Sequence, residues 1–240
     1  MGKSLAFSAT NNDILSWGEP PEEVFASLGE TERYSILGCP TELLQLIALV
    51  SQLKSPSRAS TSTPPALPAP PHDYSLLISR ITSFSPQKWI QSVLPSLNYD
   101  DPNGGSAIPP PFDISELHHH VSAYKSAVHI FALQVLSCPT PDATAHDALV
   151  DDLLFTHIAK IQPGSVFLKG AVWPVFVAGA AATTPRQRTF VKKALDEVWR
   201  VLPQDNVRSA AALLETIWND DRGGGWVEGI ARAGGDYLFI

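Results

Sequence analysis

Apolar side chains recur along this chain at the three- and four-residue spacing of amphipathic helices, and the alternating patterns typical of strands are scarce. Thr41 to Leu53 places leucine, isoleucine and valine on one broad stripe directly after Pro40. Thr184 to Gln187 combines an N-cap threonine, a first-turn proline and the glutamine of a capping box, and another apolar stripe follows. These patterns predict an all-α fold, built as a single multi-helix domain.

The same reading predicts several other helices and one buried apolar segment. Val166 to Ala182 is the most apolar stretch, but a lysine and a proline interrupt it, and it is shorter than the roughly 20 residues of a membrane span. It is predicted to form a buried helix or helix pair. Asp113 is predicted to cap a helix, and Glu116, three positions later, has the spacing of a capping box. The remaining predicted helices cover about Tyr74–Val93, Asp113–Ser137, Asp142–Ile161 and Asp205–Trp218.

Two segments lack this periodicity. Residues 54–71 are dominated by proline and small hydroxyl residues, which remove both backbone donors and apolar anchors. Residues 98–111 contain Asp-Pro, Asn-Gly-Gly and a triple proline, all typical of turns or extended backbone. Both segments are predicted to be flexible loops, the first of them disordered.

Composition and charge narrow the possible functions. The net charge is −7, from 17 basic and 24 acidic residues, and no Lys/Arg run exceeds a pair, so direct nucleic-acid binding is not expected. Cys39 and Cys138 are too far apart in the sequence for a metal-ligand cluster and favour a reducing compartment. Met1 to Trp17 lacks the apolar run of a signal peptide. We therefore expect a nuclear or cytoplasmic protein that has no membrane partner.

Glu116, His119 and His120 form the first candidate site for chemistry. At spacings i, i+3 and i+4 they can share one helix face and offer ligands to a metal ion. Against this, the cluster lies in a first helical turn, where polar side chains usually face solvent, and no second ligand pair is evident. No metal and no cofactor are therefore assigned, and His119 and His120 remain only catalytic candidates.

Asp151 and Asp152 form a second candidate site, because adjacent carboxylates at a cavity can hold magnesium against a diphosphate. Asp220, Asp221 and Glu228 follow at spacings loosely similar to a second magnesium motif. Acidic groups on helices are more often solvated faces, and the glycines at 223–225 would break the helix that such a motif needs. The solvated face is the preferred interpretation.

Aromatic residues offer a more suggestive pocket than the charged groups. Candidate pocket residues are Trp173, Phe176, Trp199 and Trp218, with alanines and glycines at 178–182 leaving room between helices. His129 is a further candidate, although a satisfied core histidine is the simpler interpretation. Basic residues between 186 and 208 form either a solvated face or a surface for an anionic ligand or protein.

Several stretches carry a resemblance to a known family. Leu37 to Leu44 reads LGCPTELL, Trp173 to Ala181 reads WPVFVAGAA, and the chain closes with GGDYLFI at 234–240. Together with Val198-Trp199-Arg200, Asn206-Val207-Arg208, Leu214 and Trp218, these stretches resemble the fungal-specific transcription factor domain. The resemblance runs from about residue 35 to the C-terminus, which leaves residues 1–34 as an N-terminal extension and 35–240 as the helical domain.

This resemblance implies a regulatory domain that binds an apolar small molecule or a protein partner and is able to dimerise. In the family such a domain usually follows a six-cysteine binuclear zinc cluster, which two distant cysteines cannot build, so no DNA-binding module is expected in this chain. The alternative is an enzyme of fungal secondary metabolism. In that role the same pocket would serve a cofactor-free cyclase or isomerase acting on a polyketide or terpenoid intermediate.

Overall fold

The computed structural model describes residues 39–54, 74–97, 112–136 and 143–220, together with residues 226, 229 and 230. Every regular element of the chain within these ranges is a helix, which confirms the predicted all-α class. None of the described helices is long and apolar enough to cross a membrane. The elements are α2 (Thr41–Lys54), α3 (Ser75–Ser83), α4 (Pro86–Val93), the 3-10 helix η1 (Leu94–Leu97), α5 (Ile114–Val135), α6 (Ala143–Asp151), the π-helix η2 (Asp152–His157), the 3-10 helix η3 (Ile158–Lys160), α7 (Val166–Lys169), α8 (Val172–Ala181), α9 (Pro185–Val201) and α10 (Asp205–Trp218).

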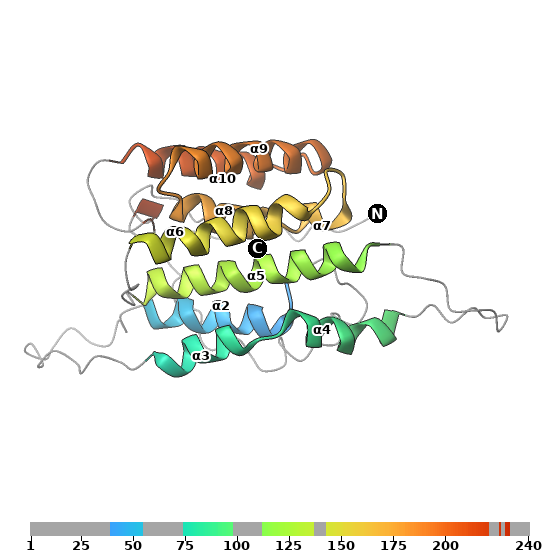
Figure 1. The fold of residues 1–240 in the computed structure, drawn as a ribbon. Coiled ribbons are helices and arrows are strands. Elements are labelled where there is room, and N and C mark those ends of the chain that lie inside the picture. Colours follow the sequence, from blue (N-terminus) through green and yellow to red (C-terminus); the bar gives the residue numbers. More distant parts are fainter. Residues whose placement is uncertain are drawn as a thin grey trace, which may run out of the picture.

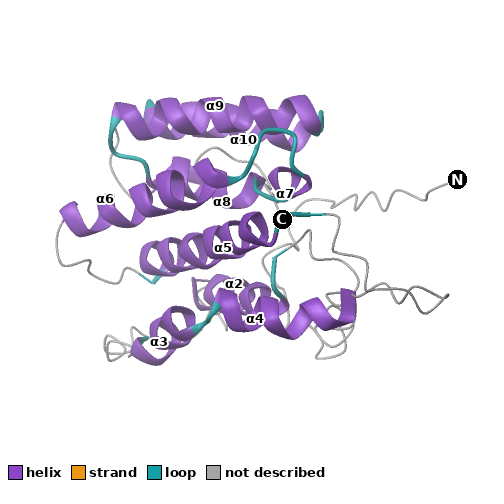
Figure 2. Ribbon diagram, turned by 45° about the vertical axis from the view of Figure 1, so that its right-hand side comes forward, coloured by secondary structure: helices purple, strands orange, loops and turns teal. Residues whose placement is uncertain are grey.

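The helices form layers around the long helix α5 (Figure 1). Below α5 in this view lie α2, α3 and α4, and above it lie α6 and α8. Helices α9 and α10 form the outermost layer, on the far side of α8 from α5, and the turned view shows the same order (Figure 2). The α9–α10 pair is therefore the part of the described fold that stands farthest from α2, α3 and α4.

Helix α8 lies at the centre of the core, and all ten of its residues are buried. Pro174 is tolerated there because it lies in the first turn, where the backbone N–H has no intrahelical acceptor to lose. Gly179 lets α9 and α10 approach closely, since a Cβ at this position would lie 2.7 Å from Leu214 Cδ1 and 2.8 Å from Val191 Cγ1. The predicted helix pair across Val166 to Ala182 is confirmed as α7 and α8.

Helix boundaries follow the sequence signals with two corrections. The Thr184 capping box is confirmed, with both reciprocal hydrogen bonds present. Asp113 does cap α5, accepting from Ser115 N, but the predicted box with Glu116 is wrong because the Glu116 carboxylate accepts from residues 162 and 165 instead. Asp205 is also an N-cap type of residue at the start of a predicted helix, but it is the first residue of α10, and the N-cap is Gln204.

Some predicted features lie elsewhere in the chain. The N-terminal extension, Cys138, and the predicted flexible loops, apart from residue 54, lie outside the described residues. The predicted helix across 142–161 is found, but it is not one regular α-helix: α6 passes into the π-helix η2 and then into η3. Residue-spacing rules assume 3.6 residues per turn, so they do not reveal a π-helical turn.

Candidate functional site

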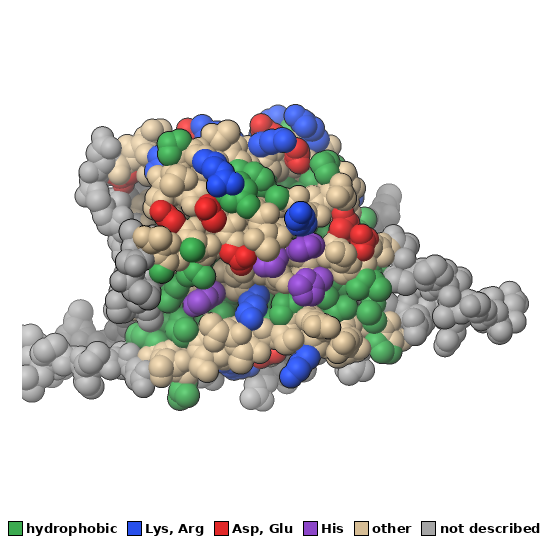
Figure 3. All heavy atoms as spheres, in the orientation of Figure 1, with side chains coloured by type: hydrophobic (Ala, Val, Ile, Leu, Met, Phe, Trp, Pro, Cys, Tyr) green, Lys and Arg blue, Asp and Glu red, His purple; other side chains and the backbone are tan. Residues whose placement is uncertain are grey.

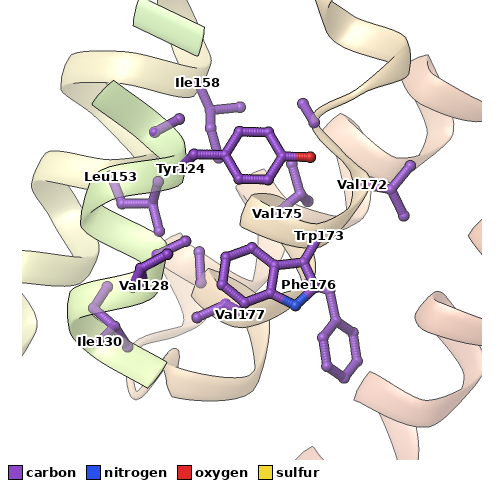
Figure 4. Close-up of a cluster of buried hydrophobic side chains, with 14 of the residues drawn as sticks. Tyr124, Val128, Ile130, Leu153, Ile158, Val172, Trp173, Val175, Phe176 and Val177 are labelled. Carbon is purple, nitrogen blue, oxygen red and sulfur yellow. The ribbon is translucent and has the colours of Figure 1, made fainter. Parts of the chain in front are cut away.

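A buried cluster of aromatic side chains joins α5 to α8 (Figure 4). The Tyr124 and Trp173 rings stack with centroids 5.9 Å apart and planes at 10°. Phe131 meets Trp173 edge-on, and Trp226 contacts both Phe131 and Phe176. Trp173 is only 7% exposed and Phe176 only 3%, so both rings contribute mainly to packing in the described core.

The Tyr124 hydroxyl is the polar end of this cluster. It donates to the Gly170 carbonyl oxygen at 2.7 Å, just before α8 begins. Burial, with a smaller contribution from Cys39, raises the pKa of Tyr124 far above its ordinary value, so the phenol remains a neutral donor. Its role in this arrangement is to hold the α7–α8 junction against α5.

Helices α9 and α10 carry a second set of aromatic contacts, in which cations cover the rings. The Arg208 guanidinium of α10 lies 3.8 Å from the centre of the Trp199 ring of α9. At the other end of the pair, Arg188 and Lys192 of α9 lie 5.6 and 5.5 Å from the Trp218 ring of α10. The two antiparallel helices thus exchange cation–π contacts at both ends.

Trp218 also links this outer layer to the core. Its indole Nε1 donates to the Gly179 carbonyl oxygen at 2.8 Å, which fixes the ring against α8. Lys192, which lies over the Trp218 ring, also forms an ion pair with Glu215 at 2.6 Å, and both side chains are about half exposed. Trp199 and Trp218 are each half-buried, in contrast to Trp173.

The sequence-predicted pocket residues therefore separate into two groups. Trp173 and Phe176 meet shared neighbours in the core, whereas Trp199 and Trp218 lie in the cation-covered layer. His129, the fifth candidate, is half-buried on α5, where burial and nearby Lys125 lower its pKa. Their grouping as one ligand-lined pocket stays a prediction.

We define the outer basic face as the six basic residues of α9 and α10. Over residues 185–218 six basic side chains stand against four acidic ones, whereas the whole chain has a net charge of −7. Figure 3 shows Lys and Arg side chains along the upper edge of the molecule, over α9. Arg186 stacks 4.0 Å from the Phe155 ring of η2, and Lys193 pairs loosely with Glu197 at 3.9 Å. The six residues are Arg186, Arg188, Lys192, Lys193, Arg200 and Arg208.

The polar candidates on α5 point to different places. The Glu116 carboxylate accepts from Gln162 N at 2.8 Å and from Ser165 Oγ at 2.7 Å, so it anchors the loop before α7. His120 is fully buried against Tyr124 and Phe167. His119 instead meets the π-helix η2. The three side chains, which the spacing placed on one helix face, therefore engage different neighbours.

His119 meets a histidine that the sequence analysis did not select. The Nδ1 atoms of His119 and His157 lie 3.3 Å apart, one donating to the other, and His157 Nε2 lies 3.5 Å from Asp152 Oδ2. His118 contacts the His119 ring edge-on. Figure 3 shows histidines gathered across the middle of one face of the molecule. Positions 119 and 157 are separated by 38 residues, so no local spacing pairs them.

Asp151 and Asp152 likewise act separately. Asp151 accepts a hydrogen bond from Gln187 Nε2 at 2.9 Å. Asp152, the first residue of η2, instead faces His157, the last residue of the same helix. The Gln187 side chain also accepts from the backbone of Thr183 and Thr184 and is buried, so Asp151 helps to fix the α8–α9 turn. A shared magnesium site is not formed by these two carboxylates, and their catalytic role stays a prediction. Within the described ranges, no three His, Cys, Asp or Glu side chains are grouped so as to hold a metal ion.

Comparison with known proteins places the chain beside a family of regulators. The profile described as "Fungal specific transcription factor domain" matches residues 10–240. The acriflavine sensitivity control protein acr-2 of Neurospora crassa is 28% identical over 201 residues, a match that covers 80% of this chain. The chain spans only 31% of the length of that relative. The search of solved structures found no match.

Proposed function

Because the chain belongs to the fungal specific transcription factor domain family, we propose that it is a regulatory domain that binds a protein partner through its outer basic face. The observation that carries this proposal is the pair of half-buried tryptophans covered by cations at the two ends of α9 and α10. Trp and Arg are the residue types that contribute most to binding at protein interfaces.

The charge of this face indicates the chemistry of the partner. Arg186, Arg200 and Arg208 are exposed, and their guanidinium groups match carboxylates in a bidentate geometry. The chain as a whole is acidic, so the excess of basic residues is local to this face. It favours a partner segment that carries acidic side chains interspersed with apolar ones. Such a segment would lie across α9 and α10 with its carboxylates over the arginines and its apolar groups beside Trp199.

A peptide-binding measurement tests the proposal. The probe is a 20-residue fluorescent peptide of alternating Asp, Glu, Leu and Phe, compared with a peptide in which Asn and Gln replace the acidic residues. We expect the acidic peptide alone to bind, with affinity falling as salt rises. The variant Lys193→Gln/Arg200→Gln is expected to weaken binding by about five- to thirtyfold, since each of the two lost charge pairs contributes about 0.5–1 kcal/mol.

The matched control removes the same charge from other helices. Lys88 on α4 and Lys169 on α7 are exposed, so Lys88→Gln/Lys169→Gln has the same net charge as the α9 variant. Equal weakening by both variants would mean that only net charge matters, and the proposal would be overturned. A dimer that dissociates on Lys193→Gln/Arg200→Gln, measured by light scattering, would assign this face to a second copy of the chain instead.

Other predictions remain proposals. Binding of an apolar small molecule lacks a specific contact in its favour, because the core aromatics contact one another. The same holds for a cyclase or isomerase reaction on a polyketide or terpenoid intermediate. A nuclear location follows from a regulatory role in transcription, and the distribution of a fluorescent fusion of the chain in cells would test it.

A further inference from the structure

The contact between His119 and His157 joins two elements that are far apart in the sequence. His119 lies in the second turn of α5, and His157 is the last residue of the π-helix η2, which packs against α5. Their Nδ1 atoms are 3.3 Å apart. Two nitrogens at this separation form a hydrogen bond only when one is protonated and the other is not, since each imidazole nitrogen is either donor or acceptor.

Some charged groups around the pair disfavour protonation of the two histidines, and others favour it. His118 and Lys160 place positive charge near His119, and Asp113 at the start of α5 partly offsets it. On the other side, Asp152 faces His157 and favours one proton there. Two neighbouring groups are engaged elsewhere: Glu116 holds the loop before α7, and Arg186 of α9 lies over Phe155 of η2. The surroundings therefore accommodate one added proton more readily than two.

The titration of both histidines follows from this environment. Burial, then His118 and Lys160, lower the pKa of His119. Burial, together with His119 and His118, lowers the pKa of His157, although Asp152 opposes the shift. In an open state, in which η2 has moved away from α5, the pKa of each histidine returns toward the ordinary value of about 6.5. Since the open state binds protons more tightly, acidification favours it, and the contact contributes its full stability only above about pH 6.5.

We propose that His119 and His157 form a pH-sensitive clamp, which holds η2 against α5 while at least one imidazole is neutral and releases η2 when both are protonated. Release of η2 would also affect the outer basic face, because η2 and the residue before it contact α9. Phe155 of η2 contacts Phe190 of α9 and lies beneath Arg186. Asp151, directly before η2, accepts a hydrogen bond from Gln187 of α9. Loosening η2 therefore removes support from the N-terminal half of α9.

Hydrogen exchange of the whole chain, followed by mass spectrometry and corrected for intrinsic rates, tests the clamp between pH 7.5 and 5.0. In the wild type we expect protection across residues 152–162 to fall by about tenfold over this range, because opening takes up at least one proton. The wild-type amides of α10 provide the internal reference, and they should change by less than about threefold. Equal loss of protection in α10 would indicate global acid unfolding and would overturn the clamp.

Substitutions identify which histidines are responsible. His119→Gln should reduce the change across 152–162 to less than about threefold, because Gln keeps a polar side chain but cannot become charged. His129→Gln is the matched control: His129 lies on the same helix and its pKa is also lowered, but its lowering charge is Lys125 rather than a histidine. It should leave the wild-type change intact. A full pH response in His119→Gln would overturn the proposal.

A direct titration keeps the proposal testable if His119→Gln fails to fold. Imidazole proton resonances of wild-type protein should show His119 and His157 titrating below pH 6.5 and in two separate steps, because the first proton disfavours the second. Independent single-step titrations of both residues at or above pH 6.5 would overturn the clamp.

Discussion

The two groups of tryptophans in this domain differ in what covers them. Trp173 of α8 is buried and contacts the Tyr124 and Phe131 rings of α5. Trp199 and Trp218 are half-buried, and each lies beneath cationic groups from the neighbouring helix. A ring buried among apolar neighbours contributes through its area and shape, whereas a ring covered by cations at the surface contributes less to stability and remains accessible to a partner.

This difference separates folding from recognition. The core cluster ties α5 to α8 and sets the stability of the domain, so substitutions there are expected to reduce the free energy of unfolding. The α9–α10 pair instead presents Arg, Lys and Trp on an outer layer supported by α8. Substitutions on the exposed part of that layer are expected to change binding more than stability.

The largest expected effect is the loss of Trp173. Trp173→Ala removes a ring that stacks on Tyr124 and contacts Phe131, and the cavity should lower the free energy of unfolding by about 3–5 kcal/mol. Trp199→Ala, the matched change in the outer layer, should cost about 1–2 kcal/mol because that ring is only half-buried. Urea unfolding followed by circular dichroism measures both, and equal costs would remove the distinction between the two groups.

A smaller effect is expected where the two regions meet. A methyl group added by Gly179→Ala would lie 2.7 Å from Leu214 Cδ1 and 2.8 Å from Val191 Cγ1. Overpacking should outweigh the gain in helix propensity and cost about 1–3 kcal/mol. The same change at Gly229 brings the methyl 3.5 Å from Ile217 Cγ1, an ordinary contact, so Gly229→Ala should be neutral or slightly stabilising in the same unfolding measurement.

The smallest effect is expected for a cation over a half-buried ring. Arg208→Gln removes the guanidinium that lies 3.8 Å from the Trp199 ring and should cost about 0.5–1 kcal/mol. Arg200→Gln removes the same charge from an exposed position and serves as the control. A double-mutant cycle with Trp199→Leu, which removes the aromatic face, isolates the contact, and a coupling energy indistinguishable from zero would mean that Arg208 only overlies the ring.

Much of the fold was predictable because helix signals are local. Periodic apolar positions, Pro at the start of a helix and the Thr184 capping box all act within a few residues, and the structure confirms the elements that they predict. Glu116 shows where local reasoning is insufficient. Its spacing from Asp113 fits a capping box, but the carboxylate instead accepts from residues 162 and 165, whose approach depends on the packing of distant segments.

The candidate sites were less predictable, for the same reason. Spacing placed His119 beside Glu116 and His120, but the fold buries His120 and turns His119 toward His157. Adjacent Asp151 and Asp152 engage Gln187 and His157, which belong to different elements. Residue spacing specifies which side chains lie on the same face of one helix. It carries no information on which other element packs against that face.

By itself, the sequence determined the all-helical class, most of the helix boundaries and the family resemblance, since these depend on periodicity, caps and recurring stretches such as Trp173 to Ala181. Only the tertiary structure decided which tryptophans are core and which are covered by cations, and which two histidines meet. Those outcomes depend on the packing of helices far apart in the chain: α8 is enclosed on every side, whereas α9 and α10 form the outer layer. Burial and pairing are properties of that arrangement, because the same residue type is packed, paired or exposed according to the helix that lies opposite it.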